Sequence, residues 1–329
     1  MARSALVVSG GSSKGAFAVG VAERLREKLN VEFDLVAGTS TGSLMAPLVV
    51  TGEFTVLEQL YSTFSAGNVL MLRQPLDVVR TGSVLDTSGL RQIMEDVYTE
   101  ERTRKILTSD KQMFITTVGL ESGRVTYFHT GPDPQRDAYS DYVAITDRAS
   151  LIDAILASAM QPVFMLPVTI ERATHVDGGV RRTVPIKVAI DNGATDVYAV
   201  VLTAENEAAD QGPFTDLVTI LKRTIDLFCQ EIVLSQIRQA QLYTDSVNYL
   251  AAVERRLKSA LPDAASTIDT ALQAADVPNP FATARVVNLH LIRPENKLLP
   301  DSLQFSPADM RRMVRLGRER VDTLWPTDV

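Results

Sequence analysis

A glycine-flanked serine constrains the fold of this chain more than any other feature. Gly38-Thr39-Ser40-Thr41-Gly42 follows an apolar run, Phe33 to Ala37, and precedes an apolar segment that reaches about Val50. A serine on a sharp turn from a strand into a helix exposes its hydroxyl, and the flanking glycines avoid clashes with both elements. The positive end of such a helix also points at the reacting centre. The pattern predicts a nucleophilic Ser40, although it also fits a serine that only caps a helix, and Pro47 predicts a bend.

The beginning of the chain repeats this order of strand, glycine turn and helix. Ala5 to Val8 is continuously apolar, Gly10-Gly11 follows, and residues 14–29 have a helical pattern. Continuous apolarity is typical of a strand that is buried on both faces of a parallel sheet. Two such units in succession predict an α/β fold.

The rest of the chain predicts further α/β units and then a helical region. Later strands are expected at 113–118, 125–129, 166–170 and 196–202, and helices at 148–160 and 185–192. Apolar residues at helical spacing predict a long helix from about 213 to 243 and another at 246–260. We expect a loop at 261–280, a strand at 286–292 and a last helix that Ser306 opens. Residues 1–329 are therefore expected to form one domain with a helical C-terminal third.

Composition and charge exclude several classes of function. The net charge of −7 argues against a nucleic-acid partner and against a polybasic membrane anchor. The single cysteine, Cys229, allows no internal disulfide, and its apolar neighbours indicate a small buried side chain. No apolar run approaches the roughly 20 residues of a membrane span. We expect a cytoplasmic protein that can also be peripheral at membranes, and the sequence leaves its oligomeric state open.

The first glycine turn, Gly10-Gly11-Ser12-Ser13-Lys14-Gly15, predicts an anion-binding loop. Backbone N–H groups at such a turn can bind the oxyanion of acyl transfer when no side chain blocks the approach. A Walker loop is excluded because Gly15, not serine or threonine, follows Lys14, and the dinucleotide fingerprint fails on spacing. A tight turn with only a packing role stays open.

A third glycine motif, Asp177-Gly178-Gly179, follows the other two, and the order of all three resembles the patatin-like phospholipase family. Residues 157–167 and 184–194 are similar to the family's segments before and after this motif. The resemblance covers roughly residues 4–203, which would be the catalytic core, and leaves 204–329 as a mainly helical extension of the same domain. The fold that it implies has three layers and a mostly parallel central sheet.

The resemblance implies a role for each motif. Ser40 would be the nucleophile and Asp177 the base of a dyad without histidine, which acts on a lipid or other acyl ester through an acyl-enzyme. The oxyanion hole maps to Gly10, Gly11 and Ser12, although the family commonly has glycine at the position of Ser12. Supporting motif positions are Lys14, Gly15, Gly38, Gly42, Gly178 and Gly179. No cofactor or metal is expected.

Alternatives remain open at this point. An acyltransferase would use the same dyad with an alcohol in place of water, and a non-catalytic lipid-binding module could keep the fold. Ser40, Asp177 and His290 follow the chain order of an α/β-hydrolase triad, but too few strands precede Ser40 for that fold. The segment from Phe64 to Pro75 contains four consecutive apolar residues, which suggests either a lid that contacts lipid or a core segment. Transient contact with a membrane surface is therefore a further expectation.

Overall fold

A central mixed sheet organises the molecule. In the computed structural model, which describes residues 3–69, 71–206, 212–272, 281, 285–301 and 304–326, nine strands form this sheet. They run in the order β11-β10-β1-β2-β5-β6-β7, with β9 also paired to β5 and β8 to β9. The strands are β1 (Ser4–Val8), β2 (Leu35–Thr39), β5 (Gln112–Gly119), β6 (Val125–Thr130), β7 (Ser140–Ala144), β8 (Val168–Ile170), β9 (Ala173–Asp177), β10 (Asp196–Val200) and β11 (Asn288–Ile292).

The parallel part of the sheet is buried on both faces, as the apolar run at the start of the chain predicts. Strands β11, β10, β1, β2 and β5 are parallel, whereas β6 and β9 run antiparallel to β5. Within β1, Leu6 and Val8 belong to one hydrophobic cluster and Ala5 and Val7 to the other. Alternate side chains of one strand thus enter two cores on opposite faces.

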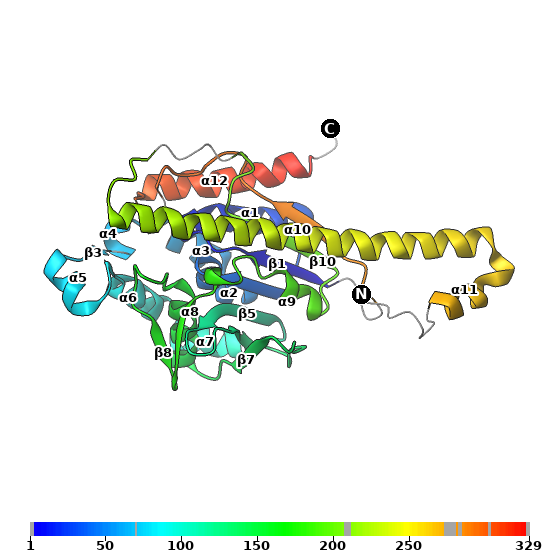
Figure 1. Cartoon of the computed structure of the whole chain (residues 1–329), viewed down its shortest axis with the longest axis horizontal. Helices are drawn as coiled ribbons and strands as arrows, with labels where there is room; N and C mark the ends of the chain where they lie inside the picture. The colour runs from blue at the N-terminus through cyan, green and yellow to red at the C-terminus, as the bar shows by residue number, and fades with distance from the viewer. Residues whose placement is uncertain are drawn as a thin grey trace.

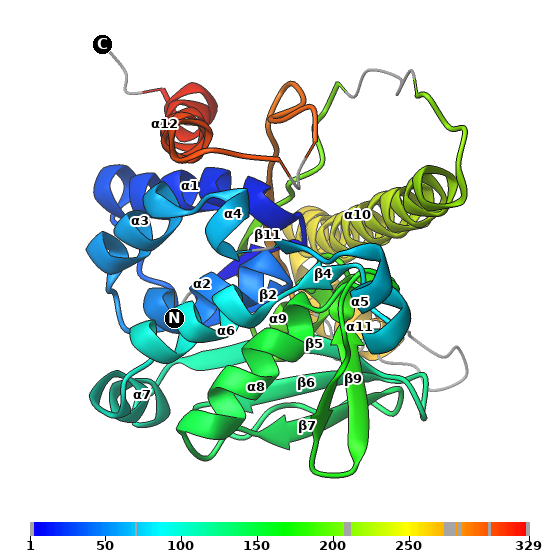
Figure 2. The same ribbon diagram turned by 90° about the vertical axis from the view of Figure 1, so that its left-hand side faces the viewer.

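Helices cover both faces and give the three-layer α/β fold (Figures 1 and 2). One core contains residues of α1, α2, α3, α8 and α12, and the other contains residues of α9 and α10. The helices are α1 (Gly15–Leu29), α2 (Thr41–Val50), α3 (Phe54–Thr63), α4 (Ala66–Val69), α5 (Pro75–Thr81), α6 (Ser88–Val97), α7 (Glu100–Leu107), α8 (Arg148–Ala159), α9 (Ile186–Asp191), α10 (Leu217–Ala260), α11 (Ala265–Leu272) and α12 (Pro307–Leu324). Short 3-10 turns are η1 (Ser12–Lys14), η2 (Gly178–Val180) and η3 (Pro262–Ala264), and β3 (Met71–Leu72) pairs with β4 (Leu85–Asp86).

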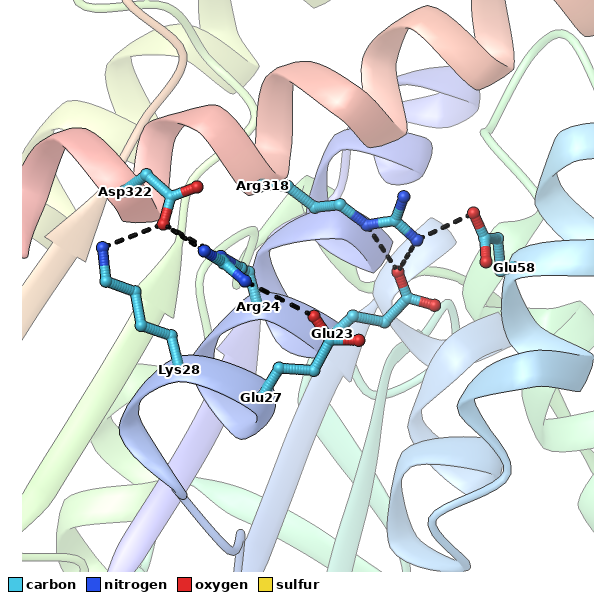
Figure 3. A network of polar contacts seen from close by, with 7 residues as sticks. All are labelled: Glu23, Arg24, Glu27, Lys28, Glu58, Arg318 and Asp322. Carbon is cyan, nitrogen blue, oxygen red and sulfur yellow. Dashed lines mark hydrogen bonds and ion pairs between the residues drawn. The ribbon is translucent and has the colours of Figure 1, made fainter.

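The last helix packs against the first, although residues 30–306 lie between them in the sequence. A Cβ atom at Gly317 would lie 2.1 Å from the Phe17 carbonyl oxygen, so only glycine allows this approach of the two backbones. An ionic network crosses the same contact (Figure 3), in which Arg318 donates to Glu23 at 2.7 Å and to Glu58 at 2.8 Å. Burial raises the pKa of Glu23 to about 7 in spite of this partner. The C-terminal helix is therefore an integral part of the fold.

The structure corrects two sequence predictions in the C-terminal third. The helices expected at 213–243 and 246–260 are one continuous helix, α10, because no glycine or proline interrupts them. Thr244 and Ser246, which could have ended a helix, direct their hydroxyls to the carbonyls of Gln241 and Leu242 within it. The loop expected at 261–280 is also wrong in part, since η3 and α11 occupy 262–272; residues 273–280 lie outside the described part.

Other boundaries shift by a few residues. The second strand begins at Leu35 rather than Phe33 and continues to Thr39, next to Ser40. Pro47 lies inside α2, which nevertheless continues to Val50. Asp177 is the last residue of strand β9, and Gly178 and Gly179 follow it in η2. The last helix begins as predicted, with Ser306 in a capping box.

The segment expected to form a lid divides into buried and exposed parts. Phe64 and Val69 are buried, whereas Met71 and Leu72 are 49% and 78% exposed on the small β3–β4 ribbon. Leu70, also part of that prediction, lies outside the described residues. Whether the ribbon acts as a lid stays a prediction.

None of the helices, as far as the structure describes them, combines the length and the apolarity that crossing a membrane would require.

Candidate active site

Ser40 occupies a strained turn between β2 and α2. Its φ and ψ angles are 55° and −120°, in a region that residues other than glycine rarely adopt. A Cβ atom at Gly38 would lie 2.3 Å from backbone atoms of Gly42, and one at Gly42 would lie 2.5 Å from the Val8 carbonyl oxygen. Both positions therefore require glycine, for the steric reason that the sequence pattern indicates.

Side chains near the turn hold the Ser40 backbone in place. The Ser40 amide donates to Ser158 Oγ at 2.9 Å, and that hydroxyl donates to the Thr116 carbonyl at 2.7 Å. The amide and the hydroxyl of Ser43 both donate to the Ser40 carbonyl, at 2.9 and 2.6 Å. Ser158 and Ser43 are thus positioning residues, which the motif analysis did not single out, although Ser158 falls inside the segment 157–167 that resembles the family.

The structure brings Asp177 to Ser40. Asp177 is 8% exposed, and its Oδ1 accepts the Gly179 amide at 2.7 Å. Burial raises the pKa of this carboxyl to about 6, and the Gly179 amide and the nearby Ser40 side chain offset only part of that rise. A buried carboxylate with a pKa just below neutrality has the properties of a general base.

The glycines after Asp177 allow the chain to turn close to β5. A Cβ atom at Gly178 would lie 2.4 Å from the Thr116 carbonyl oxygen, and one at Gly179 would lie 3.0 Å from Asp177 Oδ1. Because Ser158 binds the same Thr116 carbonyl, the Ser40 turn and the Asp177 turn share one anchor on β5. The two motifs are fixed relative to each other through this strand.

The first glycine loop lies beside Ser40. A Cβ atom at Gly10 would be 3.4 Å from Ser40 Cβ, and one at Gly11 would be 2.7 Å from the Leu202 side chain. The Gly10 amide donates to the Thr183 carbonyl at 3.0 Å. Ser12, where the family commonly has glycine, has φ 54°, a left-handed conformation that favours glycine.

Gly15 also lies in close contact with the turn. A Cβ atom there would lie 2.0 Å from Oγ1 of Thr41, which directly follows Ser40 in the sequence. Lys14, one residue earlier, ends η1 and lines the same cavity as Ser40.

A cavity of about 900 Å³ is lined by these groups and by many apolar side chains. Gly10, Gly11, Ser12, Ser40 and Asp177 line it, and so do charged side chains such as Lys222 and Asp226. Its walls include apolar residues of α2, α3, α4, α6 and α10, namely Leu44, Tyr61, Phe64, Val69, Leu90, Leu221, Ile225, Phe228, Ile232 and Val233. The sequence did not predict that α10 and residues 54–97 contribute to the cavity wall, because no motif links those segments to the glycine turns.

The cavity also contains the single cysteine. Cys229 is half-buried in its wall rather than in the core, and burial raises the pKa of its thiol to about 11. That shift opposes a thiolate nucleophile.

The histidines lie elsewhere. His290 is on β11, where it stacks on Tyr198 and contacts Trp325, and two strands separate it from β2. His175 bonds to Thr117 and packs against Phe128, and it does not line the cavity. Within the described ranges, no group of three or more His, Cys, Asp or Glu side chains gathers in a metal-binding arrangement.

The comparison with protein families agrees with this geometry. The model of the patatin-like phospholipases matches residues 6–190, which is more than half of the chain and includes all three glycine motifs. The chain belongs to the patatin-like phospholipase family.

Relatives in this family share about a quarter of the residues. A cGAMP-activated phospholipase of Escherichia coli is 27% identical over 194 residues, which cover 53% of this chain and 51% of that protein. The "Probable lipid hydrolase 463L" of Invertebrate iridescent virus 6 is 24% identical over 200 residues, 56% of this chain and 62% of that protein. The chain thus spans about half to two thirds of the length of these relatives. Among solved structures, VipD of Legionella pneumophila matches with 11% identity and a TM-score of 0.47, covering 98% of this chain and 66% of that one.

Proposed function

We propose that this protein is a lipid acyl hydrolase that cleaves carboxylic esters through an acyl-enzyme on Ser40. The observation that carries the proposal is the meeting of Ser40, on a strained turn, and the buried Asp177 carboxyl in one cavity, where the Ser40 side chain is close enough to lower the pKa of that carboxyl. A serine beside a base, in a cavity with many apolar side chains, is the arrangement that acyl transfer from a lipid needs.

The dyad supports both halves of ester hydrolysis. Asp177 accepts the Ser40 proton as Oγ attacks the ester carbonyl carbon, and it returns that proton to the alcohol oxygen when the bond to the leaving group breaks. Water then attacks the acyl-enzyme while Asp177 takes its proton, and the acid is released as Ser40 regains a hydrogen. The pKa of about 6 lets the carboxylate act as a base at neutral pH.

We assign the oxyanion hole to the amides of Gly11 and Ser12, which line the cavity beside Ser40. Gly10 has a different role in this proposal, because its amide already donates to Thr183. The absence of a side chain at Gly10 keeps the loop close to Ser40 and leaves room for the substrate carbonyl.

The substrate class follows from the cavity and from the family. The apolar walls fit an acyl chain, since burial of each methylene contributes about 0.8 kcal/mol. Two relatives carry the names phospholipase and lipid hydrolase. We therefore propose long-chain acyl esters of lipids as substrates.

Covalent labelling tests the proposal. An alkyl fluorophosphonate should label the wild type on the peptide that contains Ser40, and Ser40→Ala should remove the label. Ser62→Ala is the matched control, because that serine lies on α3 outside the cavity lining and its hydroxyl donates to the Gln59 carbonyl. Labelling that persists in Ser40→Ala would refute the assignment of the nucleophile. Release of free fatty acid without transfer to added alcohols would separate hydrolysis from acyl transfer.

A further inference from the structure

Helix α10 has apolar residues on two opposite faces. On the inner face, Val233, Ile237 and Val247 are buried against the core. The opposite face carries large apolar side chains that are between 41% and 79% exposed: Leu217, Ile220, Leu227, Phe228, Leu242, Tyr249, Leu250 and Leu257. At 1.5 Å per residue this helix of 44 residues is about 66 Å long. So many exposed apolar side chains on one helix indicate an interaction surface.

The end of α10 and the hairpin that follows have no core of their own. We call residues 248–272 the arm; it includes the last turns of α10, η3 and α11, and none of its residues is buried. Figure 1 shows this arm extending beyond the sheet, with α11 folded back from its end. Helices without tertiary packing are marginal in water. The arm therefore lacks the burial that usually stabilises a helical hairpin.

The exposed apolar residues of α10 form two patches. The first patch, Leu217 to Phe228, adjoins the active-site cavity, and the second, Leu242 to Leu257, leads into the arm. Arg238 lies between the patches and Asp245 inside the second; both are exposed, and neither forms an ion pair with another described residue. A helix that lies on an anionic bilayer carries mainly cations beside its apolar face. Helix α10 carries charges of both signs along its length, namely Lys222, Arg223, Asp226, Glu231, Arg238, Asp245, Glu254, Arg255, Arg256 and Lys258, and this mixture favours a protein partner.

The partner that fits is a second copy of the same helix in the opposite direction. Phe228, Ile232, Ser235, Gln239, Leu242, Ser246, Tyr249 and Val253 recur at alternating spacings of four and three residues, the repeat by which two helices interlock. An antiparallel pair with Ser235 opposite the partner's Ser246 places Phe228 opposite the partner's Val253. In this register Arg238 lies opposite the partner's Tyr243, two residues from the partner's Asp245 and on the same side of the pair, so the two charges can meet, and this contact occurs twice. A shift of one heptad would instead bring Arg238 next to the partner's Arg238, or Asp245 next to the partner's Asp245.

We infer that the exposed face of α10 is a homodimer interface in which the arm of each protomer packs on the first apolar patch of the other. The inference depends on the helix and not on the proposed function. Phe228 and Ile232 line the active-site cavity, so a dimer through this face would also form part of the cavity surroundings. The partner's Val253 and the partner's Tyr249 would border the cavity mouth.

Sedimentation velocity of the full chain tests the interface. The wild type should be a dimer at micromolar concentration. Tyr249→Glu should raise the dissociation constant by about 100-fold or more, since it places an unpaired charge among apolar side chains. The matched control is Leu76→Glu, a leucine of α5 that is 85% exposed and lies off α10, and it should leave the dimer intact. Circular dichroism would show that both variants are folded.

A charge exchange tests the direction and the register of the pair. Arg238→Asp and Asp245→Arg should each weaken the dimer, because each places like charges next to one another, whereas the double variant should restore it. A parallel pair would not show this rescue.

Three results would overturn the inference. They are a wild type that stays monomeric at micromolar concentration, a dimer that tolerates Tyr249→Glu, and single charge variants without effect or without rescue. A monomer that binds phosphatidylcholine vesicles and loses this binding in Tyr249→Glu would assign the surface to lipid instead.

Discussion

Replacing Asp177 by asparagine should stabilise the folded protein while it abolishes ester hydrolysis. Burial raises the pKa of Asp177 from 3.8 to about 6. At about 1.4 kcal/mol per pKa unit, the ionised carboxylate destabilises the fold by about 3 kcal/mol. Asparagine has nearly the same shape as aspartate and carries no charge at any pH. It therefore removes the free-energy cost of the buried charge together with the catalytic base.

The pH dependence separates this charge effect from any change in packing. Below pH 3.8 the carboxyl is neutral in both the folded and the unfolded state, and no penalty exists. Between 3.8 and 6 the unfolded state loses its proton first, so the wild type becomes less stable as the pH rises, and above 6 the full penalty applies. The stability difference between Asp177→Asn and the wild type should therefore grow by about 1.5 kcal/mol from pH 5 to pH 8.

Urea denaturation of both proteins at pH 5 and pH 8 measures this difference. Asp309→Asn provides a control without pH dependence in this range, because hydrogen bonds with Ser306 lower the pKa of the Asp309 carboxyl below 3.8 and it is ionised at both pH values. That variant should be less stable than the wild type by the same amount at pH 5 and pH 8. A difference between Asp177→Asn and the wild type that is constant from pH 5 to 8, or that shrinks, would refute the assignment of a buried, destabilised carboxylate.

Further predictions concern activity, packing and the exposed ribbon. The kcat/KM for ester hydrolysis should fall as the pH is lowered through about 6, because a neutral Asp177 cannot accept a proton; a profile that is flat from pH 5 to 8 would contradict this. Ser158→Ala should lower kcat and cost about 1–3 kcal/mol in a urea titration, since it removes the hydroxyl that binds the Ser40 amide. Gly317→Ala should lower the Tm although alanine favours helices, because its Cβ would lie 2.1 Å from a backbone oxygen of α1. Leu72→Ser should spare a soluble short-chain ester and reduce activity on vesicles if the ribbon contacts lipid; equal loss on both would show a structural role.

The sequence predicted those parts of the fold that local sterics and periodicity determine. The glycine turn at Ser40 was predictable because a Cβ atom at Gly38 or at Gly42 would lie within 2.5 Å of backbone atoms, so both positions require glycine in the sequence. The buried β1 strand was predictable because both of its faces need apolar residues. The sequence did not predict that the expected helices at 213–243 and 246–260 are one helix. Thr244 and Ser246 fit a helix end as well as a helix interior.

The parts of the site that depend on long-range packing could not be predicted. Ser158 is recognisable as a positioning residue only when β5 brings Thr116 next to the Ser40 turn. The cavity wall from α10 comes from a segment almost 200 residues after the nucleophile turn and has no motif of its own. Pairing of β9 with β5 places Asp177 at Ser40, and spacing along the chain contains no such information.

The most direct test of the central claim compares Asp177→Asn with His290→Ala in the hydrolysis of a long-chain acyl ester. Both proteins should be folded by circular dichroism. Asp177→Asn should lose about a thousand-fold or more in kcat/KM, as expected when a catalytic base is removed. His290→Ala should keep nearly all activity, because that histidine stacks on Tyr198 outside the cavity. An inactive His290→Ala beside an active Asp177→Asn would contradict the Ser40–Asp177 dyad.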